Sequence, residues 1–440
     1  MLLRSLRLGG SASSALCRSA SSALCRTAPL GPSRLACRAM SSIPISGAEL
    51  TSSAGASASA AASVIASAVA AAPEAVTSRA VGWWLVGTSA SVFGMVVVGG
   101  ITRLTRSGLS MTDWRPQGKR WPRDAAEWEA EFDRYKQFPE YQRLYAGSGF
   151  DIDDFKNIFF WEWSHRMYGR AIGFVFGVPL AFFALRGQIP RKLAPTLGGL
   201  FVLGGSQGLV GWWMVKSGLE AKKVDEIDGG IPRVSPYRLA THLTCAFTIF
   251  TLLLHTGLGV LQPRAEETLA ALKPLQRRMK LLAALIGVTA VSGAFVAGMQ
   301  AGYSFNTFPL MEGRLIPEGY MALQPLYRNF FESVPSVQLH HRALAVTTLT
   351  SVTGLWLWVQ RMPLPPQLRL ATDLLLVAAW GQVSLGVATL VNCVPVHLGS
   401  LHQAGALTLF SIVIFTLHSC RVPHAGRMLA RIATATPRVA

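Results

Sequence analysis

Eight long apolar segments constrain this chain more than any other feature of its sequence. They lie near 81–101, 158–185, 195–215, 237–262, 279–300, 338–360, 367–392 and 394–418. A helix needs about 20 apolar residues to cross a bilayer. Only 15% of the 440 residues are charged, which is low for a soluble protein. The sequence therefore predicts an all-α, polytopic membrane protein with eight transmembrane helices.

The first 48 residues differ in composition from everything that follows. They contain six arginines and no acidic residue, and Ser, Ala and Leu supply most of the remainder. This composition is typical of an organelle transit peptide, and the long apolar core of a secretory signal is missing. We therefore expect a mitochondrial transit peptide over 1–48 and an Ala/Ser-rich linker over 49–78. A disordered basic tail is the alternative.

The net charge of +18 follows from the transit peptide and from loops on one side of the membrane. Basic residues dominate three alternate loops and the tail: Arg186, Arg191 and Lys192; Arg264, Lys273, Arg277 and Arg278; Arg361 and Arg369; and Arg421, Arg427, Arg431 and Arg438. The first loop on the other side, 102–157, is balanced between basic and acidic residues. This pattern predicts both termini in the matrix of an inner-membrane protein, so nucleic acid is not an expected partner.

The second half of the membrane region repeats features of the first. The matched positions are His165-Arg166 with His341-Arg342, Gln207 and Gly211 with Gln382 and Gly386, and His242 with His402. They occur in the same order at nearly the same spacing. We therefore predict two pseudo-symmetric four-helix halves, over 79–262 and 263–420, followed by a basic matrix tail over 421–440.

The four repeated histidines, His165, His242, His341 and His402, have a common predicted depth. Each lies near the start of an even-numbered span, and all even spans run inward from the outer face. Zinc sites usually gather three or four ligands at short spacings, whereas each half here supplies two histidines on separate helices. Two imidazoles suit an iron that a porphyrin already holds. A single histidine at a helix end is more often an interfacial residue, but four in register favour two haem sites.

Residues around these histidines fit the same interpretation. Gly169 and Gly173 would leave the helix face after His165 bare enough for a flat macrocycle. Cationic side chains near the outer ends could pair with haem propionates, and these are Arg166, Arg170 and Arg342. His340 points roughly 100° away from His341 on a helix, so we expect it beside the site rather than on the iron.

Glu162 distinguishes the two halves. It lies three residues before His165, on the same helix face, and four before Arg166. An ion pair with Arg166 is the ordinary explanation for such a glutamate. At the matching place in the second half, three residues before His341, the residue is Gln338. Because a carboxylate is predicted beside only one of the two haems, we infer that this haem is chemically altered and that the other transfers electrons.

Several motifs of the chain resemble those of one enzyme family. They include "GGITRLTRSGLSMTDW" (99–114), "EWSHRMYGR" (162–170), "QGLVGWWMVKSGL" (207–219), "IPRVSPYRLATHL" (231–243), "SGAFVAGMQAG" (292–302), "NTFP" (306–309), "VQLHHR" (337–342) and "HQAGAL" (402–407). Together they extend over nearly all of residues 80 to 420 in the right order. The chain resembles haem A synthases of the mitochondrial and alphaproteobacterial type.

This resemblance implies a reaction and a role for each site residue. It implies that His341 and His402 bind the iron of haem b, that His165 and His242 bind the iron of haem O or haem A, and that Glu162 is catalytic. The implied reaction oxidises the C8 methyl group of haem O to the formyl group of haem A, by successive hydroxylation and loss of water. Glu162 would relay protons or stabilise positive charge at the methyl carbon.

The resemblance also implies partners, and it leaves alternatives open. We expect haem O, haem O synthase, cytochrome c oxidase assembly factors, an electron-transfer partner such as a ferredoxin, and a homo-oligomer. The first outer loop lacks the cysteine that some bacterial members carry there. A di-haem b-type electron-transfer cytochrome is the main alternative, and a non-catalytic haem carrier is a third. Glu162 and the extended outer loops favour the synthase.

Overall fold

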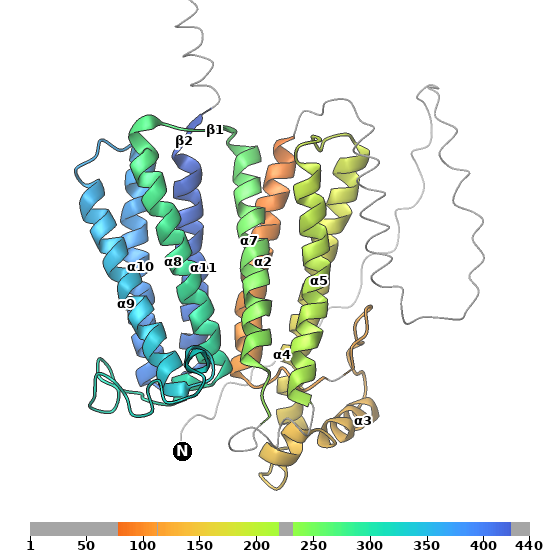
Figure 1. The fold of residues 1–440 in the computed structure, drawn as a ribbon. Helices are drawn as coiled ribbons and strands as arrows, with labels where there is room; N and C mark the ends of the chain where they lie inside the picture. The colour runs from red at the N-terminus through yellow and green to blue at the C-terminus, as the bar shows by residue number, and fades with distance from the viewer. Residues whose placement is uncertain (1–77, 112, 220–231, 424–440) are drawn as a thin grey trace, which may run out of the picture. The chain divides into compact units, whose positions relative to one another are not determined.

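The computed structural model describes residues 78–111, 113–219 and 232–423. The predicted transit peptide, nearly all of the linker and nearly all of the basic tail lie outside these residues. In the described part, eight helices have 24 or more residues (Figure 1). They are α2 (Arg79–Leu104), α4 (Ile152–Leu185), α5 (Ala194–Leu219), α7 (Pro236–Leu261), α8 (Lys273–Gly298), α9 (Val334–Val359), α10 (Pro366–Val391) and α11 (Val396–Ser419).

Each of the eight predicted apolar segments corresponds to one of these helices, so the helices themselves are confirmed. Six of the described helices are long and apolar enough to cross a membrane: α2, α4, α7, α8 with the turn before it, α10 and α11. The other two, α5 and α9, have 26 residues each. Seven glycines in α5, and the histidine pair with four threonines in α9, lower the hydropathy of these two helices. Over the described ranges, the regular structure is helical apart from one short strand pair.

The long helices pack as two groups of four. In the first group α2 contacts α4, α4 contacts α5, α5 contacts α7, and α7 returns to α2. In the second group α8, α9, α10 and α11 contact one another in the same cyclic order. The groups meet where α11 contacts α2 and α7, and where α7 contacts α8. Each group has its own buried apolar core, with Leu85, Leu197 and Leu253 in the first and Leu275, Met279 and Leu375 in the second.

Short elements connect the long helices. They are α3 (Ala125–Lys136), a π-helical turn (Tyr141–Tyr145), 3-10 turns at Ala270–Leu272, Ala301–Tyr303 and Leu326–Phe330, and strands β1 (Arg264–Thr268) and β2 (Arg421–Pro423). The two strands pair antiparallel, so they join the segment before α8 to the segment after α11. This pair is a minor departure from the predicted all-α fold.

The segment between α2 and α4 folds into a small aromatic subdomain. Its core includes Trp128, Phe132 and Tyr135 of α3, which pack on Phe155 and Phe159 of α4. The aromatic rings lie edge-to-face or stacked at centroid distances of 5.2–6.3 Å. The charge balance of this segment predicts only an outer loop. The structure shows that α3 fixes it against the beginning of α4.

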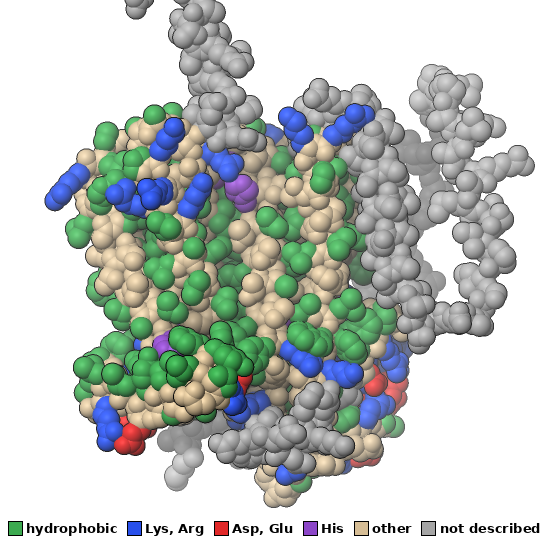
Figure 2. Space-filling view, viewed as in Figure 1, with side chains coloured by type: hydrophobic (Ala, Val, Ile, Leu, Met, Phe, Trp, Pro, Cys, Tyr) green, Lys and Arg blue, Asp and Glu red, His purple; other side chains and the backbone are tan. Residues whose placement is uncertain are grey.

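Charged side chains are distributed unequally between the two ends of the helices. Figure 2 shows Lys and Arg at the end that carries β1 and β2, whereas Asp and Glu are visible on this face only at the opposite end. The aromatic subdomain, the turns between Ala301 and Phe330, and the starts of the even-numbered spans belong to that opposite end (Figure 1). The asymmetry agrees with the loop charges of the sequence.

Candidate functional site

All four predicted ligand histidines pack against a glycine on the preceding long helix. A methyl group on that glycine would lie 2.8–3.1 Å from the nearest imidazole atom, closer than side chains normally approach. The pairs are His165 with Gly99, His242 with Gly211, His341 with Gly293, and His402 with Gly386. Each glycine lies five to eight residues before the end of its helix. The four imidazoles therefore lie at similar depth beneath the same end of the helices.

The imidazoles form one pair in each group of helices. His165 interacts electrostatically with His242, and His341 with His402. A matching hydrogen bond supports the second member of each pair. The side-chain amide of Gln207 donates to the backbone carbonyl of His242, and that of Gln382 donates to the carbonyl of His402, both over 2.8 Å.

This arrangement fits a haem in each group. Each pair offers two imidazoles from different helices, which is the number that a porphyrin-bound iron takes. The Nδ1 atom of His242 is buried and has no hydrogen-bond partner among the described residues. Such a buried polar atom is costly unless another group satisfies or coordinates the ring. Within the described ranges, no three His, Cys, Asp or Glu side chains gather as they do in zinc sites.

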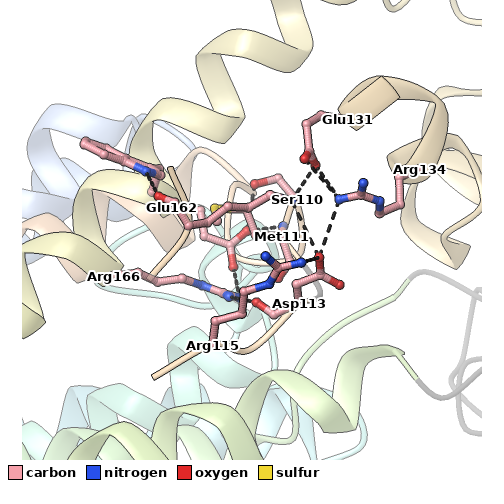
Figure 3. A network of polar contacts seen from close by, with 10 residues as sticks. Ser110, Met111, Asp113, Arg115, Glu131, Arg134, Glu162 and Arg166 are labelled. Atoms are coloured by element: carbon pink, nitrogen blue, oxygen red, sulfur yellow. Dashed lines mark hydrogen bonds and ion pairs between the residues drawn. The ribbon is translucent and has the colours of Figure 1, made fainter. Parts of the chain in front are cut away.

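Glu162 is buried on α4, three residues nearer the start of the helix than His165, where it fastens the chain that follows α2. It is 2% exposed. Its carboxylate accepts hydrogen bonds from the hydroxyl of Ser110 (2.7 Å) and the backbone N–H of Met111 (2.6 Å), and it forms an ion pair with Arg166 (Figure 3). The predicted i,i+4 ion pair is therefore present. Glu162 holds the segment after α2 against α4, one turn from His165.

The same network continues into the aromatic subdomain. Arg166 donates to the backbone carbonyls of Met111 and Asp113. The carboxylate of Asp113 pairs with Arg134 of α3 over 3.5 Å, and Arg134 also pairs with Glu131 over 2.9 Å (Figure 3). The segment between α2 and α3 is thus tied both to α4 and to α3. These contacts cover the outer side of the first histidine pair.

The second group of helices has a related anchor built without a carboxylate. The side-chain amide of Gln338 donates to the backbone carbonyls of Ala301 (2.7 Å) and Ser304 (2.6 Å), and its oxygen accepts from Arg342 over 3.1 Å. Glu162 and Gln338 thus each fasten a connecting segment to a long helix, but with opposite polarity. Glu162 accepts hydrogen bonds from its segment, whereas Gln338 donates to backbone carbonyls.

The predicted propionate partners donate mainly to backbone carbonyls of the outer segments. Arg170 donates to the carbonyls of Pro116 and Arg115, and Arg342 to those of Phe305 and Pro309. Arg166, as described above, holds Met111 and Asp113. The three arginines therefore fix the loops around the site, and pairing with propionates stays a prediction.

The other predicted neighbours of the haems have mixed surroundings. His340 stacks on Phe330 at 4.8 Å between ring centroids, away from His341. Space beside Gly173 is open, as its predicted role requires, whereas a methyl group on Gly169 would lie 3.2 Å from Met95 of α2. Gly169 therefore serves helix packing.

The described cysteines Cys245, Cys393 and Cys420 form no disulfide.

A second buried acid, Glu140, could not be predicted from the sequence patterns. It lies in the aromatic subdomain, 4% exposed, and accepts a hydrogen bond from the hydroxyl of Tyr135 over 3.0 Å. Burial raises the pKa of Glu140 to about 8, although the bond from Tyr135 acts in the opposite direction. Its residue type and its loop position alone predict a solvated surface acid.

The glycine contacts lead to a direct test. We expect Gly386→Ala to displace the imidazole of His402, because the new methyl group would lie 2.8 Å from Cε1. The variant should lose most of the haem that copurifies with the wild-type protein, measured as haem per polypeptide. Gly381→Ala on the same helix is the control, since nothing lies within 4 Å of its added methyl group. That change should stabilise the helix by about 1 kcal/mol. Equal haem content in both variants would contradict the close packing.

Comparison with known proteins agrees with this architecture. The family model described as COX15-CtaA, cytochrome oxidase assembly protein, matches residues 82–414. Heme A synthase COX15 of Arabidopsis thaliana is 47% identical over 78% of this chain and 75% of its own length. Heme A synthase of Rhodospirillum centenum is 45% identical over 80% of this chain and 91% of its own. Heme A synthase COX15 of Homo sapiens is 43% identical, over 79% and 84% respectively. The chain belongs to the COX15-CtaA family of cytochrome oxidase assembly proteins.

Proposed function

We propose that this protein is a haem A synthase, an oxidoreductase that converts the C8 methyl group of haem O into the formyl group of haem A. The observation that carries the proposal is the pair of similar histidine sites with a buried carboxylate beside only one of them. Relatives that share 43–47% of their residues with this chain are named heme A synthase. The product would serve cytochrome c oxidase.

The two histidine pairs have different roles in this proposal. His165 and His242 would hold the iron of the substrate haem O and of the product haem A. His341 and His402 would hold haem b, which supplies one-electron transfer when it is bound. The close contacts with Gly211 and Gly386 support this arrangement, because they fix how far each imidazole can move toward its neighbouring helix.

Glu162 is the proposed catalytic residue of the first pair. Its buried carboxylate can relay protons during the oxidation, or stabilise positive charge that develops at the methyl carbon. Ser110, Met111 and Arg166 fix the carboxylate one helical turn from His165. The network around Arg166 and α3 covers this side of the site, which helps to exclude water from the reacting group.

We further propose a membrane arrangement. All eight long helices, including α5 and α9, would cross the mitochondrial inner membrane as two pseudo-symmetric halves, 79–262 and 263–420. Both termini would lie in the matrix, and the histidine pairs near the intermembrane space. The cyclic packing order common to both groups supports the two halves. Figure 2 supports the orientation, because the end with β1 and β2 shows basic but no acidic side chains on this face, whereas the opposite end shows both.

The proposed partners follow from the chemistry. Haem O would come from haem O synthase, and haem A would pass to cytochrome c oxidase assembly factors. Oxidation of a methyl group to a formyl group releases electrons or needs an external oxidant, so an electron-transfer protein of the ferredoxin type is proposed as a further partner. We also propose a homo-oligomer, with no nucleic-acid partner.

Complementation tests this function. The full chain, expressed in cells that make haem O but lack haem A synthase, should restore haem A, measured by extraction and chromatography. His165→Ala and His242→Ala should both abolish that recovery, because each removes one imidazole from the substrate pair. Failure of the wild-type chain to produce any haem A, despite correct membrane insertion, would contradict the proposal.

A further inference from the structure

The two histidine pairs differ in the hydrogen bonds of their Nδ1 atoms. In the second pair, His341 Nδ1 lies 2.7 Å from the hydroxyl of Ser292, and His402 Nδ1 lies 3.2 Å from the backbone carbonyl of Gln382. In the first pair, neither imidazole has a hydrogen bond to any described residue, and His242 Nδ1 is buried without a partner.

The partners of the second pair determine where the imidazole protons lie. The hydroxyl of Ser292 donates to the carbonyl of Thr289 over 2.7 Å, so its oxygen is left to accept from His341 Nδ1–H. The carbonyl of Gln382 likewise accepts from His402 Nδ1–H. Both imidazoles therefore carry the proton on Nδ1 and present the lone pair of Nε2.

The described residues of the first group supply no such acceptors. Gly99 lies nearest Nε2 of His165, whereas Gly293 lies nearest Cε1 and Nδ1 of His341, so the Nδ1 atom of His165 is turned away from the helix that carries Gly99. The residue before Gly99 is Val98, whose side chain neither donates nor accepts, where the second group has Ser292. The bond from Gln207 to the carbonyl of His242 is present, but the return bond that links His402 to Gln382 has no counterpart at His242.

We propose that Ser292 is a positioning residue that, together with the carbonyl of Gln382, fixes the second pair for permanent haem binding, whereas the first pair is left free to exchange its haem. An acceptor on Nδ1 fixes the tautomer and orientation of a ligating imidazole and makes it a stronger ligand. A site that must release its product needs imidazoles that are weaker and less firmly oriented ligands. This inference rests on the proposed function, because exchange here means that the first pair binds haem O and releases haem A. The difference in Nδ1 hydrogen bonds between the two pairs does not depend on the reaction.

Ser292→Ala in the full-length purified protein tests whether Ser292 positions His341 for haem binding. Loss of the hydroxyl should weaken binding of ferric haem to the second pair by about tenfold. If the affinity for ferrous haem is unchanged, the midpoint potential of the bound haem b should be about 59 mV higher than in the wild-type protein. The measurements are a potentiometric titration followed optically and the rate of haem loss to apomyoglobin. Ser292→Thr keeps a hydroxyl and should restore both values.

Haem loss from the wild-type protein tests the exchange at the first pair. The substrate-side haem should pass to apomyoglobin about tenfold faster than haem b. An unchanged potential and haem-loss rate in Ser292→Ala would overturn the role of Ser292, and equal loss rates for the two haems of the wild-type protein would overturn the role of the missing acceptors. If the protein makes no haem A but Ser292→Ala still shifts the potential, the proposed function fails and the positioning role stands.

Discussion

Replacing His341 with alanine is expected to abolish the b-type absorption spectrum of the purified protein. The imidazole of His341 contacts Gly293, interacts with His402 and is oriented by Ser292. Removing an iron ligand should weaken haem b binding by more than the roughly 10- to 100-fold that loss of a supporting residue costs. The measurement is a reduced-minus-oxidised difference spectrum, normalised to protein.

His340→Ala is the matched control for this change. His340 is adjacent in sequence, but it stacks on Phe330 and lies 3.4 Å from the hydroxyl of Tyr320. Its replacement should leave the b-type spectrum in place. The assignment of His341 is wrong if its alanine variant keeps the wild-type spectrum, or if both variants lose haem equally through unfolding.

Replacing Glu162 with glutamine should leave haem bound but stop the reaction. The variant should accumulate haem O or a hydroxylated intermediate in place of haem A, measured by mass analysis of extracted haem. Because Glu162 is buried and accepts from Ser110 and Met111 beside Arg166, the change should also destabilise the fold by about 2 kcal/mol. That loss is small enough for the variant to be purified.

The hydrogen bonds of Glu162 show why this substitution separates two functions. A glutamine at 162 can still accept from Ser110 and Met111 through its amide oxygen, so it should keep these two anchoring bonds. Its neutral amide removes the charge and the ion pair with Arg166. Normal haem A output from Glu162→Gln would mean that Glu162 only anchors the loop.

The helices could be predicted because long apolar runs leave the chain few alternatives in a bilayer. Their ends could not. The apolar pattern predicts a start at 158 for the second helix, whereas α4 begins at Ile152. Asp151 caps its first turn, and Asp154 donates and accepts in the reciprocal capping box. The six extra residues carry Phe155 into the aromatic subdomain.

The histidines of the site could be predicted from their repeat, but their surroundings could not. Gly99 and Gly293 matter because their helices approach the imidazoles closely, and no periodicity in the sequence shows such an approach. Arg342 stands beside His341 in sequence, which favours a role toward the haem. The structure shows it donating to the carbonyl of Phe305, since the outer loop folds back over the helix end. Loop paths of this kind depend on tertiary packing.

Haem extraction and mass analysis of the purified wild-type protein test the central claim most directly. The claim is that His165 and His242 hold a haem that is altered, while His341 and His402 hold one that is not. The account predicts haem b together with haem O, haem A or a hydroxylated intermediate. His165→Ala should retain haem b alone. Haem b as the sole species in the wild-type protein, even when the cells supply haem O, would contradict the account and favour a di-haem electron-transfer cytochrome.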